Sequence, residues 1–127
     1  MTGGLLLDTH AVLWYFDDSR KMPESVYAQI DDPGVAVLVS AASLWEIAIK
    51  SGLGKLNVGG DLPERIAASG FETLDVTPAH AWHVRELPQY HRDPFDRILI
   101  AQAQMESLRL VTRDPVFASY DGLDVAW

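Results

Sequence analysis

Short runs of apolar residues alternate along this chain with longer segments of helical spacing. Leu5–Leu7 and Val35–Val39 are continuous apolar runs, which are typical of strands buried on both faces in a parallel sheet. Arg109–Thr112 reads as a further strand, Phe71–Val76 alternates as a less buried one, and Leu123–Ala126 is a candidate edge strand. The alternation predicts an α/β fold with a central, mainly parallel sheet of four to five strands and helices on both faces.

The helices expected between these strands are marked by caps, prolines and glycines. Ser40 and Asp61 are predicted N-caps, and Gly52 with Gly54 is expected to end a helix. The expected helical segments are His10–Phe16, Pro23–Ile30, Ala41–Ser51, Leu62–Ala68, Pro78–Leu87 and Pro94–Ser107, with a helical turn at Val116–Ala118. The 127 residues show no linker or internal repeat, so we expect a single domain over residues 1–127.

Composition excludes several classes of protein. The chain has no cysteine, so it forms neither disulfides nor thiolate–zinc sites. No apolar run reaches the length of a membrane span, and the first residues lack the basic region of a signal peptide, so we expect a cytoplasmic protein with no membrane partner. The formal net charge of −8 argues against binding nucleic acid through bulk electrostatics. It leaves room for a local site where cations offset clustered carboxylates.

The stretch from His91 to Ala103 holds an acid at the start of a predicted helix. Asp93 before Pro94 is typical of an N-cap followed by the first helical residue. Asp96 then lies in the first turn, where free N–H groups and the helix dipole favour a carboxylate. An unbroken apolar run follows it, so we expect the helix to be buried around much of its circumference. Asp96 alone is consistent with either dipole complementation or a ligand role.

Three further acids stand in comparable places. Asp8 and Asp114 each follow a predicted strand, and Glu46 lies on a helix that leaves the end of another strand. Strand carboxyl ends share one edge of a parallel sheet and line the crevice where ligands bind. Each acid also has a plain structural alternative, since Asp114 could cap a short helix and Glu46 could pair with Lys50.

Clustered carboxylates repel one another unless a cation neutralises them. Sites made only of carboxylate oxygens suit Mg²⁺ or Mn²⁺, which can activate water and stabilise charge on a phosphate. The acids therefore indicate metal-assisted phosphodiester hydrolysis.

Other patterns carry less information. His80 and His83 lack the spacing of a zinc motif, and the chain has no nucleophile elbow, Walker A loop or dinucleotide fingerprint. The four tryptophans are expected in the core or at an interface: Trp14, Trp45, Trp82 and Trp127. Five basic residues are candidates for phosphate contacts or for ordinary solvated charge: Lys50, Lys55, Arg92, Arg97 and Arg113.

Four segments of the chain resemble those of the PIN-domain nucleases and, within that family, the VapC toxins of bacterial toxin–antitoxin pairs. In order, they are Leu5–His10, Ser43–Lys50, His91–Ala103 and Val111–Asp114. The run Arg92–Arg97 is specific for one branch of the family. The acidic quartet of the family falls on Asp8, Glu46, Asp96 and Asp114, and Thr9 with Thr112 matches the hydroxyl positions beside it.

The resemblance implies a PIN-like three-layer fold and an Mg²⁺- or Mn²⁺-dependent endoribonuclease that cleaves tRNA or ribosomal RNA to stop translation. It implies that the quartet supplies both the catalytic residues and the metal ligands, with Asp8 and Asp96 as the main ligands. Glu46 and Asp114 would hold a second ion or position waters. It also implies a homodimer and a VapB-type antitoxin whose C-terminal segment lies across the acidic groove.

Three alternatives stay open at this point. The chain could be a PIN-type nuclease of RNA processing, a metal-dependent phosphatase, or a degenerate PIN-like module that serves only in complex assembly. A receiver domain is disfavoured, because it needs an aspartate after a middle strand and a lysine near the end of a late one. Ser40 and Thr112 stand at those places instead.

Overall fold

The computed structural model describes residues 4–127 of the chain. Its strands are β1 (Leu5–Leu7), β2 (Val37–Ser40), β3 (Glu72–Leu74), β4 (Arg109–Val111) and β5 (Val125–Ala126). Its α-helices are α1 (Thr9–Asp17), α2 (Glu24–Asp31), α3 (Ala41–Gly52), α4 (Leu62–Ala68), α5 (Pro78–His83) and α6 (Pro94–Met105). Three short 3₁₀ segments complete the fold: η1 (Ser19–Lys21), η2 (Val84–Glu86) and η3 (Pro115–Ser119).

The five strands form one sheet in the order β3-β2-β1-β4-β5, and each pairing in it is parallel. β1 is central: Leu6 pairs in register with Leu38 of β2 on one side and with Leu110 of β4 on the other. A central parallel strand is covered on both faces, which explains why Leu5–Leu7 is apolar without interruption. The predicted parallel α/β architecture is confirmed.

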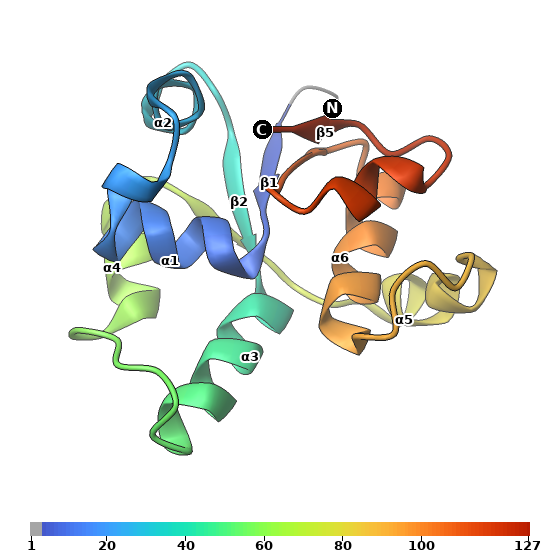
Figure 1. Cartoon of the computed structure of the whole chain (residues 1–127), viewed down its shortest axis with the longest axis horizontal. Coiled ribbons are helices and arrows are strands. Elements are labelled where there is room, and N and C mark those ends of the chain that lie inside the picture. Colours follow the sequence, from blue (N-terminus) through green and yellow to red (C-terminus); the bar gives the residue numbers. More distant parts are fainter. Residues whose placement is uncertain (1–3) are drawn as a thin grey trace.

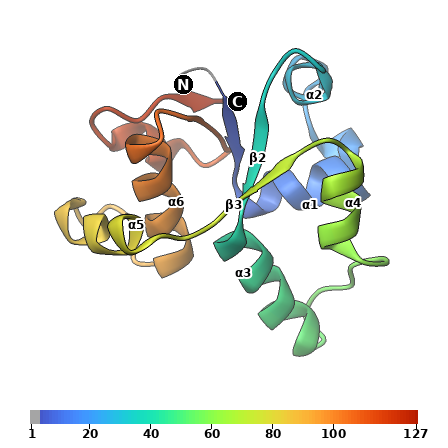
Figure 2. The same ribbon diagram turned by 180° about the vertical axis from the view of Figure 1, so that it is seen from behind.

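Helices cover both faces of this sheet (Figures 1 and 2). Successive strand side chains point to opposite faces. Leu5 and Leu7 therefore join the apolar cluster under α1, α2 and α4, while Leu6 joins the cluster under α6 and η3. The expected three layers are present, with β1 buried between the two helical layers.

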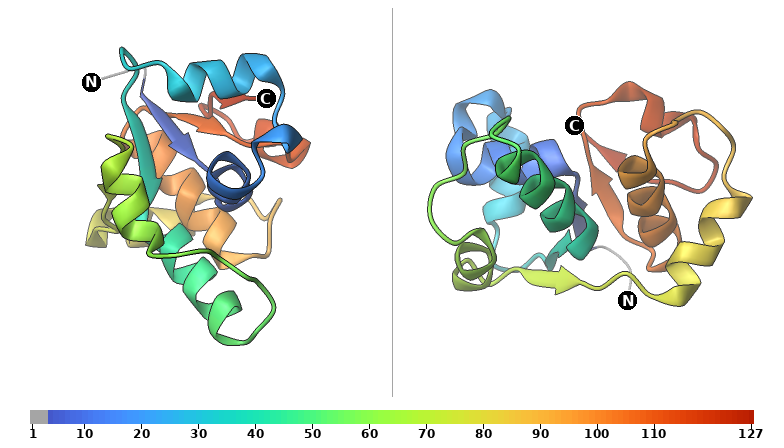
Figure 3. Two further views of the ribbon diagram at one scale, coloured as in Figure 1. Left: turned by 90° about the vertical axis from the view of Figure 1, so that its left-hand side faces the viewer. Right: turned by 90° about the horizontal axis from the view of Figure 1, so that it is seen from below.

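All strands end at the same edge, because their pairings are parallel. α1 follows β1 after a single residue, and α3 follows β2 directly. In the view from below (Figure 3, right), α1 and α3 lie on one side of this edge and α6 on the other. The arrangement places the end of β1 and the starts of α3 and α6 at this edge, and α3 contacts α6.

Several predicted boundaries were too long. The third strand, expected over Phe71–Val76, is only β3, and it is mostly exposed because it lies at the sheet edge. The helix expected to reach Leu87 is regular only in α5 and continues as η2. The edge strand expected from Leu123 is reduced to β5.

The helix expected to reach Ser107 ends at Met105. Ser107 adopts a positive φ of 54°, and the Leu108 N–H donates to the Ala103 carbonyl at 2.9 Å. This is the geometry of a helix end that usually carries glycine at the left-handed position. The end was missed in the sequence because serine stands there instead. Within residues 4–127, no helix is long and apolar enough to cross a membrane.

Candidate active site

Asp8 lies where β1 ends and acts as the N-cap of α1. Its carboxylate accepts the Ala11 N–H at 2.7 Å, and only 6 % of the residue is exposed. Burial raises the pKa of Asp8, and hydrogen bonding from Thr112 and Ala11 opposes that rise in part. The prediction that Asp8 is a buried acid at a strand end is confirmed.

Glu46 is a buried residue of α3, and both of its carboxylate oxygens have partners. The Thr9 hydroxyl donates to Oε1 at 2.7 Å, and the Lys50 ammonium contacts Oε2 at 2.8 Å. The hydrogen bond to Glu46 raises the pKa of Lys50. The structural alternative of a Glu46–Lys50 pair is thus confirmed, and Thr9 is a direct partner of the quartet.

Asp96 lies in the first turn of α6, whose N-cap is Asp93. The Asp93 carboxylate accepts the Phe95 N–H at 2.8 Å, which leaves Asp96 free of the capping role. Burial raises the pKa of Asp96 to about 6, with further contributions from the charges of Asp93, Glu46 and Asp8. Asp96 therefore lies in the electrostatic field of two other quartet acids.

Asp114 follows β4 and caps η3. Its Oδ1 accepts the Val116 N–H at 2.9 Å, and its own N–H donates to the Thr112 hydroxyl at 3.1 Å. The charge of Asp114 contributes to the raised pKa of Asp8. Asp114 is thus both the predicted cap and a neighbour of the acid at the end of β1.

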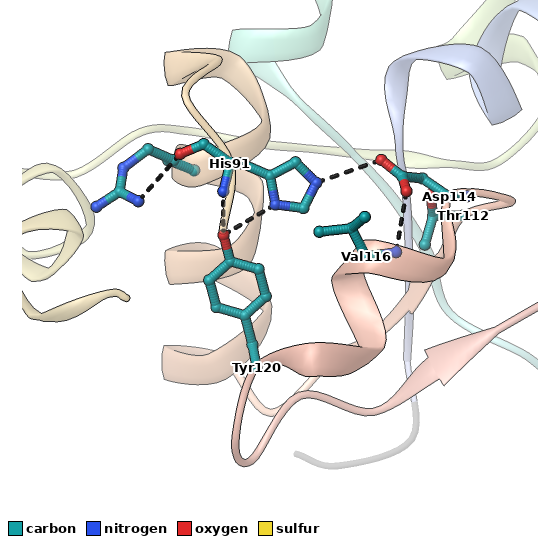
Figure 4. A network of polar contacts seen from close by, with 6 residues as sticks. His91, Thr112, Asp114, Val116 and Tyr120 are labelled. Carbon is teal, nitrogen blue, oxygen red and sulfur yellow. Dashed lines mark hydrogen bonds and ion pairs between the residues drawn. The ribbon is translucent and has the colours of Figure 1, made fainter. Parts of the chain in front are cut away.

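Two residues beside Asp114 were not identified from the sequence (Figure 4). His91 Nε2 lies 3.3 Å from Asp114 Oδ2, and His91 Nδ1 lies 2.8 Å from the Tyr120 hydroxyl. The His91 N–H also donates to that hydroxyl at 3.0 Å. His91 begins the stretch that carries Asp96, but no spacing rule connects it with Tyr120, so only the fold brings them together.

The four acids share one edge, but as placed they do not close around a common point. Among residues 4–127, no three carboxylate or imidazole side chains form a ready metal-binding group. The donor chemistry nevertheless fits a hard divalent cation, since the set offers only carboxylate oxygens beside a few hydroxyls. Burial is the main cause of the raised pKa values of Asp8 and Asp96, and the charges of neighbouring acids add to both shifts.

The interpretation of Arg97 as a phosphate contact or a solvated charge is wrong. Its side chain is buried, and its guanidinium donates to main-chain carbonyls of the preceding segment, at Val84, Leu87, Pro88 and His91. Arg97 therefore holds the 84–91 segment against α6. Lys50 remains at the acidic edge, paired with Glu46.

Two of the four tryptophans lie outside the core. Trp14 and Trp127 are partly buried and in edge contact, whereas Trp45 is 64 % exposed and Trp82 is also exposed. Trp45 lies edge-on to Phe95 and lines an open groove of about 490 Å³ between α3, α5 and α6. The groove is lined mainly by apolar residues: Ala41, Ala42, Trp45, Val76, Ala81, Val84, Pro94, Phe95 and Ile98.

Residues 5–123 match the profile of the PIN domain family. No curated protein sequence matches the chain significantly. A chain in the crystal structure of VapBC2 from Rickettsia felis, bound to a promoter DNA fragment, superposes with a TM-score of 0.71 at 19 % identity, covering 96 % of each chain. For DNA-bound VapBC from Salmonella typhimurium the TM-score is 0.66 at 20 % identity, with 99 % of this chain and 98 % of that chain covered. For FitAcB from Neisseria gonorrhoeae the TM-score is 0.59 at 21 % identity, with 95 % of each chain covered. At these identities the likeness establishes the fold.

Proposed function

Since the chain belongs to the PIN-domain family, we propose that it is an Mg²⁺- or Mn²⁺-dependent endoribonuclease that cleaves tRNA or ribosomal RNA. We propose further that it is the cytoplasmic toxin of a VapBC-type pair. The similarity to chains of VapBC complexes supports the toxin role.

One observation carries the nuclease proposal. Asp8, Glu46, Asp96 and Asp114 come from four separate segments and lie along the carboxyl edge of one parallel sheet. Burial alone would favour neutral side chains here, yet four acids stand within reach of one another's charge. Clustered carboxylates of this kind are costly to fold and gain most from binding a cation. Such clustering is expected of a cation site and not of a core.

Each quartet acid has a role that follows from its position. Asp8 and Asp96 would hold the cation from the end of β1 and the start of α6. Glu46, kept in place by Thr9 and Lys50, and Asp114, at the start of η3, would hold a second ion or position water. A bound divalent cation supplies an activated water and neutralises charge on the scissile phosphate.

Two protein partners belong to the proposal. A VapB-type antitoxin would lay its C-terminal segment across the acidic edge, where the net charge of −8 favours a basic segment. A second copy of the chain would form a homodimer, and the apolar groove beside Trp45 offers surface for it. The antitoxin pairing is tested by co-expressing the chain with any short reading frame found next to its gene and measuring the mass of the complex.

The nuclease is tested with purified wild-type, Asp96→Asn and Asp61→Asn proteins. Asp61→Asn is the matched control, since Asp61 is an exposed N-cap and asparagine caps equally well. Each protein is incubated with a labelled tRNA and ribosomal RNA pool, in Mg²⁺ or in a chelator. Wild type and Asp61→Asn should cut RNA in Mg²⁺ only. Asp96→Asn should cut RNA at least about 100-fold more slowly than wild type, since loss of a mere outer partner of a metal ligand lowers metal affinity or activity by about 10–100-fold.

Three results would contradict the proposal. Cleavage by Asp96→Asn at the wild-type rate would show that Asp96 is not a metal ligand. Turnover of p-nitrophenyl phosphate without cleavage of RNA would favour the phosphatase alternative. Absence of both RNA cleavage and phosphatase activity in folded wild-type protein would favour the alternative of a non-enzymatic module.

A further inference from the structure

We propose that His91 and Tyr120 form a relay of hydrogen bonds that positions the Asp114 carboxylate as a metal ligand. The inference rests on the proposed function, because it takes Asp114 to be part of the metal site. It assigns a positioning role to two residues outside the acidic quartet, which come from the segment before α6 and from the end of η3 (Figure 4).

The contacts are consistent with one set of hydrogen-bond directions, which we assign starting from the main chain. The Tyr120 hydroxyl accepts the main-chain N–H of His91 at 3.0 Å, since an N–H can only donate. Its single proton is then free for His91 Nδ1, 2.8 Å away. An imidazole that accepts at Nδ1 carries its proton on Nε2, which lies 3.3 Å from Asp114 Oδ2. Tyr120 thereby selects the tautomer in which His91 donates to Asp114.

Both oxygens of Asp114 are held by this arrangement. The Val116 N–H occupies one lone pair of Oδ1 at 2.9 Å, and His91 Nε2 occupies one lone pair of Oδ2. Each carboxylate oxygen has a second lone pair, so the group is fixed in orientation and can still bind a cation. Hydrogen bonds of this kind to the ligands of a metal orient them and tune their affinity.

Packing fixes the imidazole itself. His91 is only 8 % exposed, with its ring centroid 4.4 Å from that of Phe117 and 5.5 Å from that of Tyr120. Arg97 also donates to the His91 carbonyl at 3.4 Å, which ties the backbone of His91 to α6. A buried ring with both nitrogens partnered has little freedom to turn, so the orientation of Asp114 follows from the core beneath it.

A structural role alone would explain burial and packing, so the test must separate stability from positioning. The variants are His91→Leu, His91→Gln and Tyr120→Phe. His91→Gln keeps an N–H donor near the place of Nε2, whereas His91→Leu removes it. Matched controls are His83→Leu, which breaks a contact with Gln104 on α6, and Tyr15→Phe, which removes a hydroxyl bonded to Asp31.

The first measurement is the ¹⁵N spectrum of His91 in mildly alkaline buffer without metal, where free imidazole is neutral. Wild type and Tyr15→Phe should show the tautomer protonated at Nε2. Tyr120→Phe, which lacks the hydroxyl proton, should show both tautomers. An Nδ1-protonated His91 in wild type would overturn the relay whatever the stability of the variants.

The second measurement is Mn²⁺ affinity by calorimetry, with thermal unfolding as the check on folding. His91→Leu should bind Mn²⁺ about 10–100-fold more weakly than wild type, as expected for an outer partner of a metal ligand. His91→Gln should recover most of this loss of affinity. The affinity of Tyr120→Phe should lie between those of His91→Leu and wild type, and both controls should bind Mn²⁺ as wild type does. The kcat for RNA should fall in the same order with KM little changed.

Asp114→Asn separates failure of the relay from failure of the site. If Asp114→Asn binds Mn²⁺ as wild type does, Asp114 is not a ligand, and both the proposed metal site and the relay are contradicted. If Asp114→Asn binds weakly while folded His91→Leu binds as His83→Leu does, the site stands and the relay is overturned. If His91→Leu does not fold, Tyr120→Phe decides, since it removes a single oxygen.

Discussion

The two ends of α6 bury polar groups in contrasting ways. At its C-terminal end, the ring of His80 is fully buried, with Nδ1 accepting the Thr77 N–H at 3.1 Å and Nε2 lying 2.9 Å from Glu106 Oε1. At its N-terminal end, Asp96 faces other acids, and its pKa is raised to about 6. Each nitrogen of the buried His80 ring has a partner, whereas the acidic edge brings carboxylates of like charge near one another.

The contrast gives a physical criterion for a site. Buried polar groups that serve the fold find their partners within the chain, as Thr77 and His80 do in a reciprocal capping box. Buried groups of like charge that remain unneutralised lower stability or take up protons, and a bound cation relieves both costs. By this criterion the His80 end of α6 needs no ligand, whereas the Asp96 end does. Three substitutions test this difference.

The largest effect on stability is expected at the His80 corner. His80→Leu leaves the Thr77 N–H and Glu106 without their partners and should lower the free energy of unfolding by about 2–3 kcal/mol. Mn²⁺ affinity should not change. Urea unfolding and calorimetry measure the two quantities, with His83→Leu as the control. A loss of metal affinity without a loss of stability would reverse the assignment of the two ends.

At the acidic edge, a substitution should change the free energy of unfolding in the opposite direction. Asp96→Asn should raise the free energy of unfolding of the metal-free protein by about 1–2 kcal/mol near pH 7, after allowance for solvent screening of a half-buried group. The control Asp61→Asn should be close to neutral. A destabilised Asp96→Asn would show that the carboxylate is satisfied within the fold.

The same group predicts the pH dependence. The pKa of Asp96 is raised in the fold from 3.8 to about 6, so between these values the folded state binds more protons than the unfolded state. Stability of the metal-free protein should therefore fall as the pH rises through this window and then level off. Asp8 contributes in the same direction, since its pKa is also raised. In Asp96→Asn the fall should be smaller, which denaturant midpoints at several pH values will show.

The smallest effect concerns an imperfection in the His80 corner. Gln102 Nε2 donates to the Asp75 carbonyl at 3.2 Å, but Oε1 is buried without a partner within the described residues. Gln102→Met loses the hydrogen bond and also the unpaired oxygen, two effects of similar size. We expect a change in the free energy of unfolding below about 1 kcal/mol. A loss as large as that of His80→Leu would show that Gln102 is essential to the corner.

The fold was largely predictable because its strongest patterns are local. Leu5–Leu7 is a short apolar run of the kind typical of a buried strand, and Ser40, Asp61 and Asp93 each cap the helix that their sequence position indicates. Boundaries failed where long-range packing or an unusual residue decides them, as at β3 on the sheet edge and at Ser107 with its positive φ.

The sequence indicated where the four acids lie and placed Thr9, Lys50 and Thr112 beside them, but it did not indicate His91 and Tyr120. Parallel pairing of the strands is enough to bring Asp8, Asp96 and Asp114 to one edge, and the order of strands and helices along the sequence predicts this pairing. The contact of His91 with Tyr120 joins residues 29 positions apart through packing against Phe117, which no local pattern encodes. Arg97 was misread for the same reason, because its acceptors are main-chain carbonyls of the preceding segment.

The central position of β1 also has a consequence for synthesis of the protein. β1 is made first among the strands, but one of its two neighbours, β4, comes after most of the helices, and Asp114 follows later still. A growing chain can pair β1 with β2 early, yet it lacks both the β4 neighbour and the last acid until residue 114 has been added. The acidic edge is therefore completed late in synthesis, and a chain that stops before residue 114 lacks both β4's following loop and one of the four acids.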